Sequence, residues 1–358
     1  MDKTPKLFIP GPTHVPKQVM QSMTNPQIGH RAPEFSRLMS NIVKGIQDVL
    51  YTNNSVFLVS HSATGLWEMG IRNSVKRSVL HTVNGSFSAK WSTVSKECGF
   101  DVEILEYEWG KGVKVKDIDR LLSTGKHDVF ALVHNETSTG VMSPLEPISD
   151  LLKTKYPDII WLVDAVSSMA GQKIEVDKLG IDYILSSTQK AWGLPAGFSI
   201  CAISDRMIEL AKTIPLKGYF LDVGVYAKYY EKMQTPSTPS IPHMFGFQYV
   251  LDQIKREGLD GRWKRHEEMA QFTRQWAIDH GQKLFPEKGF ESKTITCISN
   301  KQKWDINRIY DELLNRGFRM DRGYGKLRGD AFRIAHMGNI MMDDLNEYLH
   351  NFDEALNG

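Results

Sequence analysis

Ile184-Leu-Ser-Ser-Thr-Gln-Lys-Ala-Trp-Gly-Leu-Pro-Ala-Gly-Phe198 joins the end of an apolar run to a loop rich in turn residues. Its one lysine, Lys190, follows small hydroxyl residues and precedes two glycines and a proline. A lysine between a strand end and such a loop is poorly solvated, and desolvation favours the neutral amine that attacks carbonyls. The stretch fits either a Schiff-base lysine or an ordinary surface lysine after a core strand.

A carboxylate ends the preceding apolar run. Ile159-Ile-Trp-Leu-Val-Asp164 is typical of a parallel strand that is covered on both faces. The carboxyl ends of such strands are where open α/β sheets bind ligands. Pyridoxal phosphate requires an acid there, because a carboxylate keeps the pyridine nitrogen protonated and the ring electron-withdrawing. Asp164 could instead cap the next turn, but Asp164 and Lys190 on successive strand ends together favour a pyridoxal phosphate site.

These residues carry a family resemblance. Asp164-Ala-Val-Ser-Ser168 followed by Ser187-Thr-Gln-Lys190 resembles the class V aminotransferases of the fold-type I pyridoxal phosphate enzymes. Within that family the chain is most similar to the alanine–glyoxylate and serine–pyruvate aminotransferase group. The resemblance extends from Pro10-Gly-Pro12 to Arg333-Ile-Ala-His-Met-Gly338, and the order and spacing of these motifs make it specific.

The resemblance implies an α/β fold. We expect a mainly parallel seven-stranded sheet with helices on both faces, plus a smaller C-terminal α+β domain. Residues 1–20 should form an N-terminal segment that packs on the small domain. Residues 21–258 should form the large cofactor-binding domain, and residues 259–358 the small one. One long helical segment, about 241 to 279, should link them.

Composition limits the other possibilities. The 358 residues suffice for two domains, and the net charge of +2 gives no sign of nucleic-acid or membrane-surface binding. The three cysteines, Cys98, Cys201 and Cys297, lack metal-like or paired spacing, so we expect reduced thiols in a cytoplasmic protein and no metal site. No signal-like N-terminus or membrane-length apolar run is expected.

A small, hydroxyl-rich turn offers a phosphate cradle. His61-Ser-Ala-Thr-Gly65 lies between an expected strand, 56–60, and an expected helix, 66–75. Free N–H groups and the positive end of the helix dipole attract phosphate there, although plain N-capping explains the same residues. The resemblance assigns the cofactor phosphate to Ser62, Ala63 and Thr64.

The resemblance also implies the other cofactor contacts. Phe87 should stack on the pyridine ring, Thr137 should contact the ring near its phenolic oxygen, and Gln189 should offer its backbone N–H to the phosphate. Thr238, in a proline-rich segment, should reach the phosphate of the neighbouring subunit of a homodimer with shared active sites. A second contact expected from that segment is in doubt, because Thr235 stands where alanine–glyoxylate members have tyrosine.

Arg333 is the expected ligand of the substrate carboxylate. It projects from an otherwise apolar strand, and its fork geometry suits bidentate carboxylate binding, although many strand arginines are simply at an edge. His30 and Arg31 form a polar turn that could meet an anion at the mouth of the site. The cations of the 322–333 segment could bind a second anionic group if they converge on the pocket, or could be solvated loop charges.

The expected reaction moves an amino group from alanine or serine to glyoxylate or pyruvate. Phosphoserine aminotransferase is the alternative, because the His30-Arg31 turn also occurs in that group. A cysteine desulfurase is less consistent, since those enzymes have histidines where this chain has Gln189 and Phe87. A non-catalytic relative would typically lack the lysine or the acid, and both are present.

Overall fold

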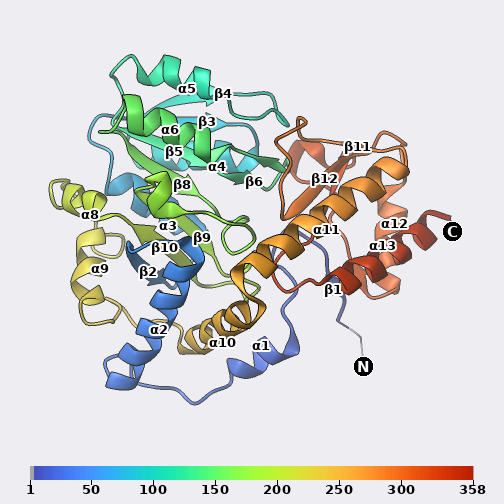
Figure 1. Ribbon diagram of the computed structural model, residues 1–358, viewed down its shortest axis with the longest axis horizontal. Coiled ribbons are helices and arrows are strands. Elements are labelled where there is room, and N and C mark those ends of the chain that lie inside the picture. Colours follow the sequence, from blue (N-terminus) through green and yellow to red (C-terminus); the bar gives the residue numbers. More distant parts are fainter. Residues whose placement is uncertain (1–3, 358) are drawn as a thin grey trace.

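A computed structural model describes residues 4–357 and has two lobes (Figure 1). The larger lobe is built on a seven-stranded sheet with the strand order β2-β10-β9-β8-β5-β3-β4. Only β10 runs antiparallel to its neighbours, so the prediction of a mainly parallel seven-stranded sheet is confirmed. The strands, in sheet order, are β2 (Ser55–Val59), β10 (Ser199–Ile203), β9 (Tyr183–Ser187), β8 (Ile160–Asp164), β5 (Val129–Val133), β3 (Ser78–Val83) and β4 (Asp101–Glu106).

Helices cover both faces of this sheet. Side chains alternate along a strand, so in β8 Trp161 and Val163 enter one hydrophobic core while Ile160 and Leu162 enter the other. This double burial explains why the strand is apolar throughout. One core is completed by α2 (Pro33–Leu50), α5 (Val115–Leu122), α6 (Leu145–Lys155), α7 (Val176–Leu179) and α10 (Ile241–Glu257), and the other by α3 (Ala63–Arg72), α4 (Ser86–Glu97), α8 (Asp205–Lys212) and α9 (Val223–Tyr230).

The smaller lobe has its own core and its own antiparallel sheet, β11-β12-β14. The first strand of the chain, β1 (Lys6–Leu7), pairs with β13 (Phe318–Arg319), so the N-terminal segment lies against this lobe. The elements of the lobe are α11 (Leu259–Asp279), β11 (Lys283–Leu284), β12 (Ile295–Ser299), α12 (Ile306–Asn315), β13, the 3-10 turn η1 (Gly325–Leu327), β14 (Ala331–Ala335) and α13 (Met342–Asn357). The remaining elements of the chain are α1 (Lys17–Ser22) and the hairpin of β6 (Asn135–Glu136) and β7 (Val141–Met142).

The connection between the lobes differs from the expected single helical segment. Gly258, at a φ of 78°, separates α10 from α11, because a left-handed residue interrupts helical hydrogen bonding. The domain boundaries at 20 and 258 stay a prediction, and residues 1–3 and 358, which they include, lie outside the described residues.

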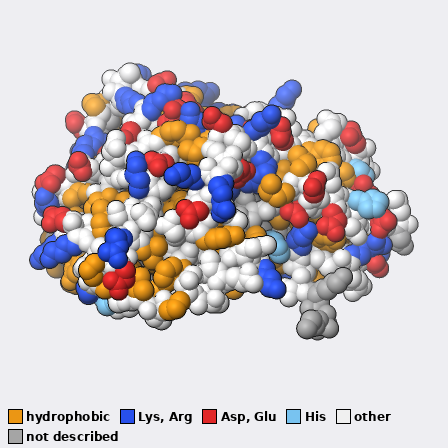
Figure 2. Space-filling model, turned by 60° about the horizontal axis from the view of Figure 1, so that its bottom comes forward, with side chains coloured by type: hydrophobic (Ala, Val, Ile, Leu, Met, Phe, Trp, Pro, Cys, Tyr) orange, Lys and Arg blue, Asp and Glu red, His pale blue; other side chains and the backbone are white. Residues whose placement is uncertain are grey.

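The surface offers no large area of one charge on the face shown in Figure 2, where acidic and basic side chains are interspersed. That distribution agrees with the net charge of +2. Across residues 4–357, none of the helices combines the length and apolar character needed to cross a bilayer. The same residues contain no group of three or more His, Cys, Asp or Glu side chains able to hold a metal ion.

Candidate active site

Lys190 lies at the carboxyl end of β9, beneath the N-terminal segment. Its Nζ donates a hydrogen bond of 2.8 Å to the carbonyl oxygen of Pro10. Gly11 is required here, because a Cβ at this residue (φ +144°) would lie 2.6 Å from Nζ. Burial, and then the positive charge of Arg333, lowers the pKa of Lys190 to about 8. A larger fraction of the amine is therefore neutral at pH 7 than for an ordinary lysine.

Asp164 ends β8, the strand next to β9. Its two carboxylate oxygens accept hydrogen bonds of 2.7 Å from Trp67 Nε1 and from the backbone N–H of Val166. Burial raises the pKa of Asp164 to about 6, and these two donors oppose that effect. A buried carboxylate held in this way gains from a cationic partner, such as a protonated pyridine nitrogen.

A cavity of about 160 Å³ joins the two residues. Eight of the residues predicted from the sequence line it together: Ser62, Ala63, Thr64, Phe87, Thr137, Asp164, Gln189 and Lys190. Ser62 precedes the first turn of α3, and its side chain makes no capping hydrogen bond. The first N–H groups of α3 and the Ser62 hydroxyl therefore stay available to an anion, as expected for a phosphate cradle.

Glu136 and His134 have structural roles. The Glu136 carboxylate accepts hydrogen bonds from the backbone N–H of Ser88 at 2.8 Å and from the Ser138 hydroxyl at 2.6 Å. It thereby fixes the start of α4, which carries Phe87, to the turn that follows Thr137. His134 is buried, which lowers its pKa to about 3, and its ring bonds to Ser168 and Gln172.

Arg333 lies beside the cavity wall rather than in it. Asp321 accepts hydrogen bonds from Nε (2.8 Å) and Nη2 (2.7 Å), and the carbonyl of Thr137 accepts one from Nη1 (2.8 Å). Three of the five N–H groups of the guanidinium are thus engaged within the described chain. The other two remain for a carboxylate, and the contact with Thr137 puts them next to the cavity.

Besides Arg333, three predicted residues do not line the cavity of their own chain. Thr238 is exposed, and Arg31 is exposed beside the same segment, where it donates to the carbonyls of Thr235 (2.6 Å) and Pro236 (3.2 Å). His30 adjoins Arg31. The structure thus brings the predicted anion-binding turn and the predicted interface segment together, away from Lys190.

The cations of the 322–328 loop also lie elsewhere. Arg322 donates to Asn307 at 3.0 Å and stacks on the Tyr310 ring at 4.2 Å. Lys326 lies 4.2 Å from the centre of the Trp109 ring, and Arg328 is exposed. None of these three cations lines the Lys190 cavity.

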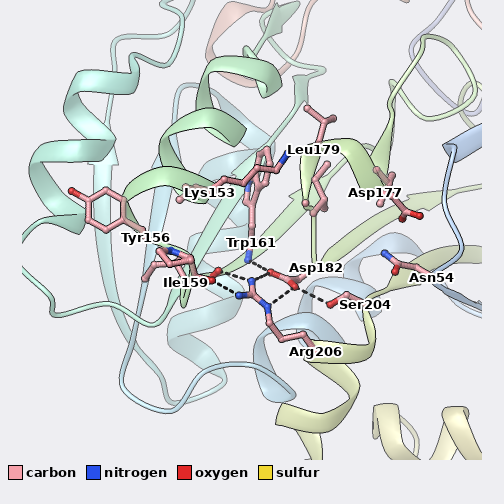
Figure 3. A pocket seen from close by; sticks show the side chains of 15 residues that line it. Asn54, Lys153, Tyr156, Ile159, Trp161, Asp177, Leu179, Asp182, Ser204 and Arg206 are labelled. Atoms are coloured by element: carbon pink, nitrogen blue, oxygen red, sulfur yellow. Dashed lines mark hydrogen bonds and ion pairs between the residues drawn. The ribbon is translucent and has the colours of Figure 1, made fainter.

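A larger cavity, of about 420 Å³, lies at the opposite ends of β8 and β9. Its central polar groups are already paired with one another: Arg206 donates to Asp182 and to the carbonyl of Ile159, and Ser204 donates to Asp182 at 2.8 Å (Figure 3). Because these charges neutralise each other and the amino ends of parallel strands are not where α/β sheets bind ligands, we assign no site there.

Sequence reasoning missed several residues of the site. Trp67 is three residues beyond Thr64 on α3, and an aromatic one turn after the cradle was the only signal for it. Asn135, Val133, Val166 and Ser187 also line the cavity, as does Lys90, whose Nζ lies 6.0 Å from the Trp67 ring. Asp321 was missed because nothing in the sequence indicates that it pairs with Arg333.

Three polar atoms in this wall indicate what the cavity holds. Ser187 Oγ, Gln189 Oε1 and Asn135 Oδ1 are buried and have no hydrogen-bond partner among the described residues. Unpartnered buried polar atoms cost free energy unless a ligand or water satisfies them. A ligand with a phosphate for the α3 cradle, a ring for Phe87 and a basic nitrogen for Asp164 fits these residues. With the sheet that carries it, the arrangement is that of a fold-type I pyridoxal phosphate enzyme.

Comparison with known proteins agrees with this class. The family described as aminotransferase class-V matches residues 6–302. The chain therefore belongs to the class V aminotransferases, and it is a transaminase that uses pyridoxal phosphate.

Relatives and solved structures cover nearly the whole chain. An L-aspartate–glyoxylate aminotransferase of Paracoccus denitrificans is 32% identical and a serine–glyoxylate aminotransferase of Arabidopsis thaliana 31%; each alignment covers 93% of this chain and 86% of the relative. An alanine–glyoxylate aminotransferase of Nostoc sp. superposes with a TM-score of 0.92 at 28% identity, over 99% of this chain and 95% of that one. A phosphoserine aminotransferase of Cytophaga hutchinsonii gives 0.91 at 27%, over 98% and 99%.

Proposed function

We propose that this aminotransferase moves an amino group from alanine or serine to glyoxylate or pyruvate. The observation that carries the proposal is the placement of the four cations of residues 322–333. Arg322, Lys326 and Arg328 contact other groups or solvent, and of the four only Arg333 adjoins the cavity wall. One guanidinium suits a donor with one carboxylate. The alanine–glyoxylate and serine–glyoxylate relatives support the choice of donor and acceptor.

The proposed mechanism assigns one task to each side chain. Bound pyridoxal phosphate supplies an aldehyde for the amino group and a ring that accepts electrons from the α-carbon. Asp164 would hold the proton on the pyridine nitrogen, and Lys190 Nζ would take the proton from the donor α-carbon and deliver it to the cofactor carbon that carried the aldehyde. Ser62, Ala63, Thr64 and the Gln189 N–H would hold the phosphate, Phe87 would stack on the ring, and Thr137 would contact it.

Arg333 orients the donor through its carboxylate. Two free N–H groups suffice for a bidentate pair, and Asp321 prevents the guanidinium from turning, because it already holds Nε and Nη2. A carboxylate fixed at one end of the donor presents the α-carbon to Lys190 at the other end.

A cysteine-based reaction finds no support in the described chain. Cys297 is buried in β12, opposite Arg333 in the sheet, and burial raises the pKa of its thiol to about 12. A thiol with that pKa is almost wholly protonated at pH 7 and is a poor nucleophile.

A donor screen tests the substrate assignment. We expect the kcat/KM of the purified holoenzyme for alanine or serine, with glyoxylate as acceptor, to exceed that for phosphoserine by about tenfold or more, because none of the loop cations Arg322, Lys326 and Arg328 lines the pocket to pair with a phosphate. The measurement is steady-state turnover at matched acceptor concentration. The opposite order, with the phosphoserine preference lost in Arg31→Ala, would establish the phosphoserine alternative instead.

The proposal includes a homodimer with shared sites. Thr238 is exposed in its own chain and lies near Arg31, so we expect both to approach the Lys190 cavity of the neighbouring subunit, Thr238 at the phosphate. Thr238→Val, which keeps the shape but removes the hydroxyl, should then weaken pyridoxal phosphate binding several-fold, about 1 kcal/mol. Equilibrium dialysis of the cofactor measures this effect, with Ser237→Ala as the neighbouring control. An active monomer in sedimentation at assay concentration would contradict the shared site.

A further inference from the structure

Tyr324 contacts both a residue of the cofactor cavity, Phe87, and the proposed carboxylate-binding residue, Arg333. Its ring stacks on Phe87, with the ring centres 5.2 Å apart and the planes at 26°. Its other neighbour is Arg333, whose Cζ lies 5.3 Å from the centre of the same ring. Phe87 belongs to the larger lobe and Arg333 to the smaller one, so one exposed ring touches both lobes.

The loop is built to hold this ring in place. Gly323 has a φ of +89°, and a Cβ there would lie 2.3 Å from the carbonyl oxygen of Ala331. Asp321 accepts a hydrogen bond of 2.9 Å from the Gly323 N–H with the carboxylate that also binds Arg333. Leu327 is buried behind the loop. The backbone around Tyr324 is therefore fixed by contacts that do not involve the Tyr324 side chain.

A donor amino acid must reach from Lys190 to Arg333, one of the two residues that this ring touches. Its α-carbon lies near Lys190, whose Nζ is 5.9 Å from the centre of the Phe87 ring, and its carboxylate lies at Arg333. The donor side chain leaves the α-carbon between these points. An aromatic ring that spans Phe87 and Arg333 borders the space that remains for that side chain.

We propose that Tyr324 forms the outer wall of the donor side-chain pocket and restricts donors to short side chains. The inference rests on the proposed function in one respect, the binding of the donor carboxylate by Arg333. It deepens that function, because it names the residue that sets the permitted length of the side chain. Removal of the ring should open the pocket without moving the loop, since the loop is held by Asp321, Gly323 and Leu327.

The test compares leucine with alanine as donor in single half-reactions, followed by the visible absorbance of the holoenzyme. Tyr324→Ala should raise the ratio of the leucine to the alanine specificity constant by about tenfold or more relative to wild type, since several methylene groups gain room. Tyr324→Phe, which keeps the ring, should leave the ratio within about twofold. Arg328→Ala, an exposed change in the same loop, is the matched control and should also leave it unchanged.

Two results would overturn the inference: a ratio in Tyr324→Ala within about twofold of wild type, or an equal change in Tyr324→Phe. If Tyr324→Ala fails to fold or retain the cofactor, Tyr324→Val keeps an apolar contact with Phe87 and is judged by the same ratio. Failure of the proposed function can be distinguished from failure of this inference. The proposed function is tested by the donor preference of the wild-type enzyme, whereas the role of Tyr324 is tested by the change in the leucine-to-alanine ratio between variants.

Discussion

Lys190→Ala should lower turnover by about 10⁴-fold or more while the fold and the assembly persist, because it removes both the amine that binds the cofactor aldehyde and the group that moves the α-proton. Packing loses little, since the one hydrogen bond of Nζ is to the carbonyl of Pro10. At a pKa of about 8, roughly a tenth of the amine is neutral at pH 7, far more than for a lysine at 10.5. Burial thus prepares this side chain for nucleophilic attack.

The measurement for Lys190→Ala is single-turnover transfer with saturating alanine and pyridoxal phosphate, together with the thermal unfolding midpoint. Lys153→Ala is the matched control, because Lys153 is an exposed lysine at the larger cavity, at the other ends of the same strands. It should keep activity within about twofold. Partial recovery of Lys190→Ala by added methylamine would support proton transfer as the missing step. Turnover of Lys190→Ala within about tenfold of wild type would refute the assignment.

The strand pattern predicted the centre of the site because chemistry and topology coincide there. Buried parallel strands are apolar throughout, so Asp164 and Lys190 were conspicuous at their ends, and parallel neighbours bring such ends together. The turn at Ser62 could be predicted from the sequence for the same reason, because it joins the end of a strand to the start of a helix.

The outer parts of the site follow from contacts that local pattern does not encode. Trp67 meets Asp164 across 97 residues of chain, and Asp321 reaches Arg333 through a loop whose path depends on Gly323. The break at Gly258 was also missed, because a single glycine within a helical pattern is often tolerated. The role of Thr238 requires a second chain, so it stays a prediction.

Asp164 has an electrostatic role that makes its replacement informative. In the free chain, burial raises its pKa from 3.8 to about 6. Stability from this group is therefore fully present below about pH 3.8 and is lost as the pH rises through about 6, because the ionised form is poorly solvated. In the proposed mechanism, a cation on the ring nitrogen of the bound cofactor would compensate that ionised form. The carboxylate would then serve the cofactor at a cost to the stability of the free protein.

Asp164→Asn should lower the rate of α-proton removal by about 10² to 10³-fold, because a neutral amide cannot keep the pyridine nitrogen protonated as negative charge develops on the ring. The amide has one acceptor for two donors, Trp67 Nε1 and the Val166 N–H. The lost hydrogen bond costs about 1–2 kcal/mol, and this loss opposes the stability gained when a buried ionised carboxylate is removed. Exchange of the alanine α-hydrogen in deuterated buffer, followed by NMR, isolates the proton step from binding.

Trp67→Phe provides the comparison that separates charge from structure, since it removes the same hydrogen bond but leaves the carboxylate in place. It should slow exchange by less than about tenfold, because the cation on the ring still faces an ionised partner. Equal losses in Asp164→Asn and Trp67→Phe would mean that the carboxylate acts only by holding the wall of the cavity. An unchanged exchange rate in Asp164→Asn would show that this acid is not the partner of the pyridine nitrogen.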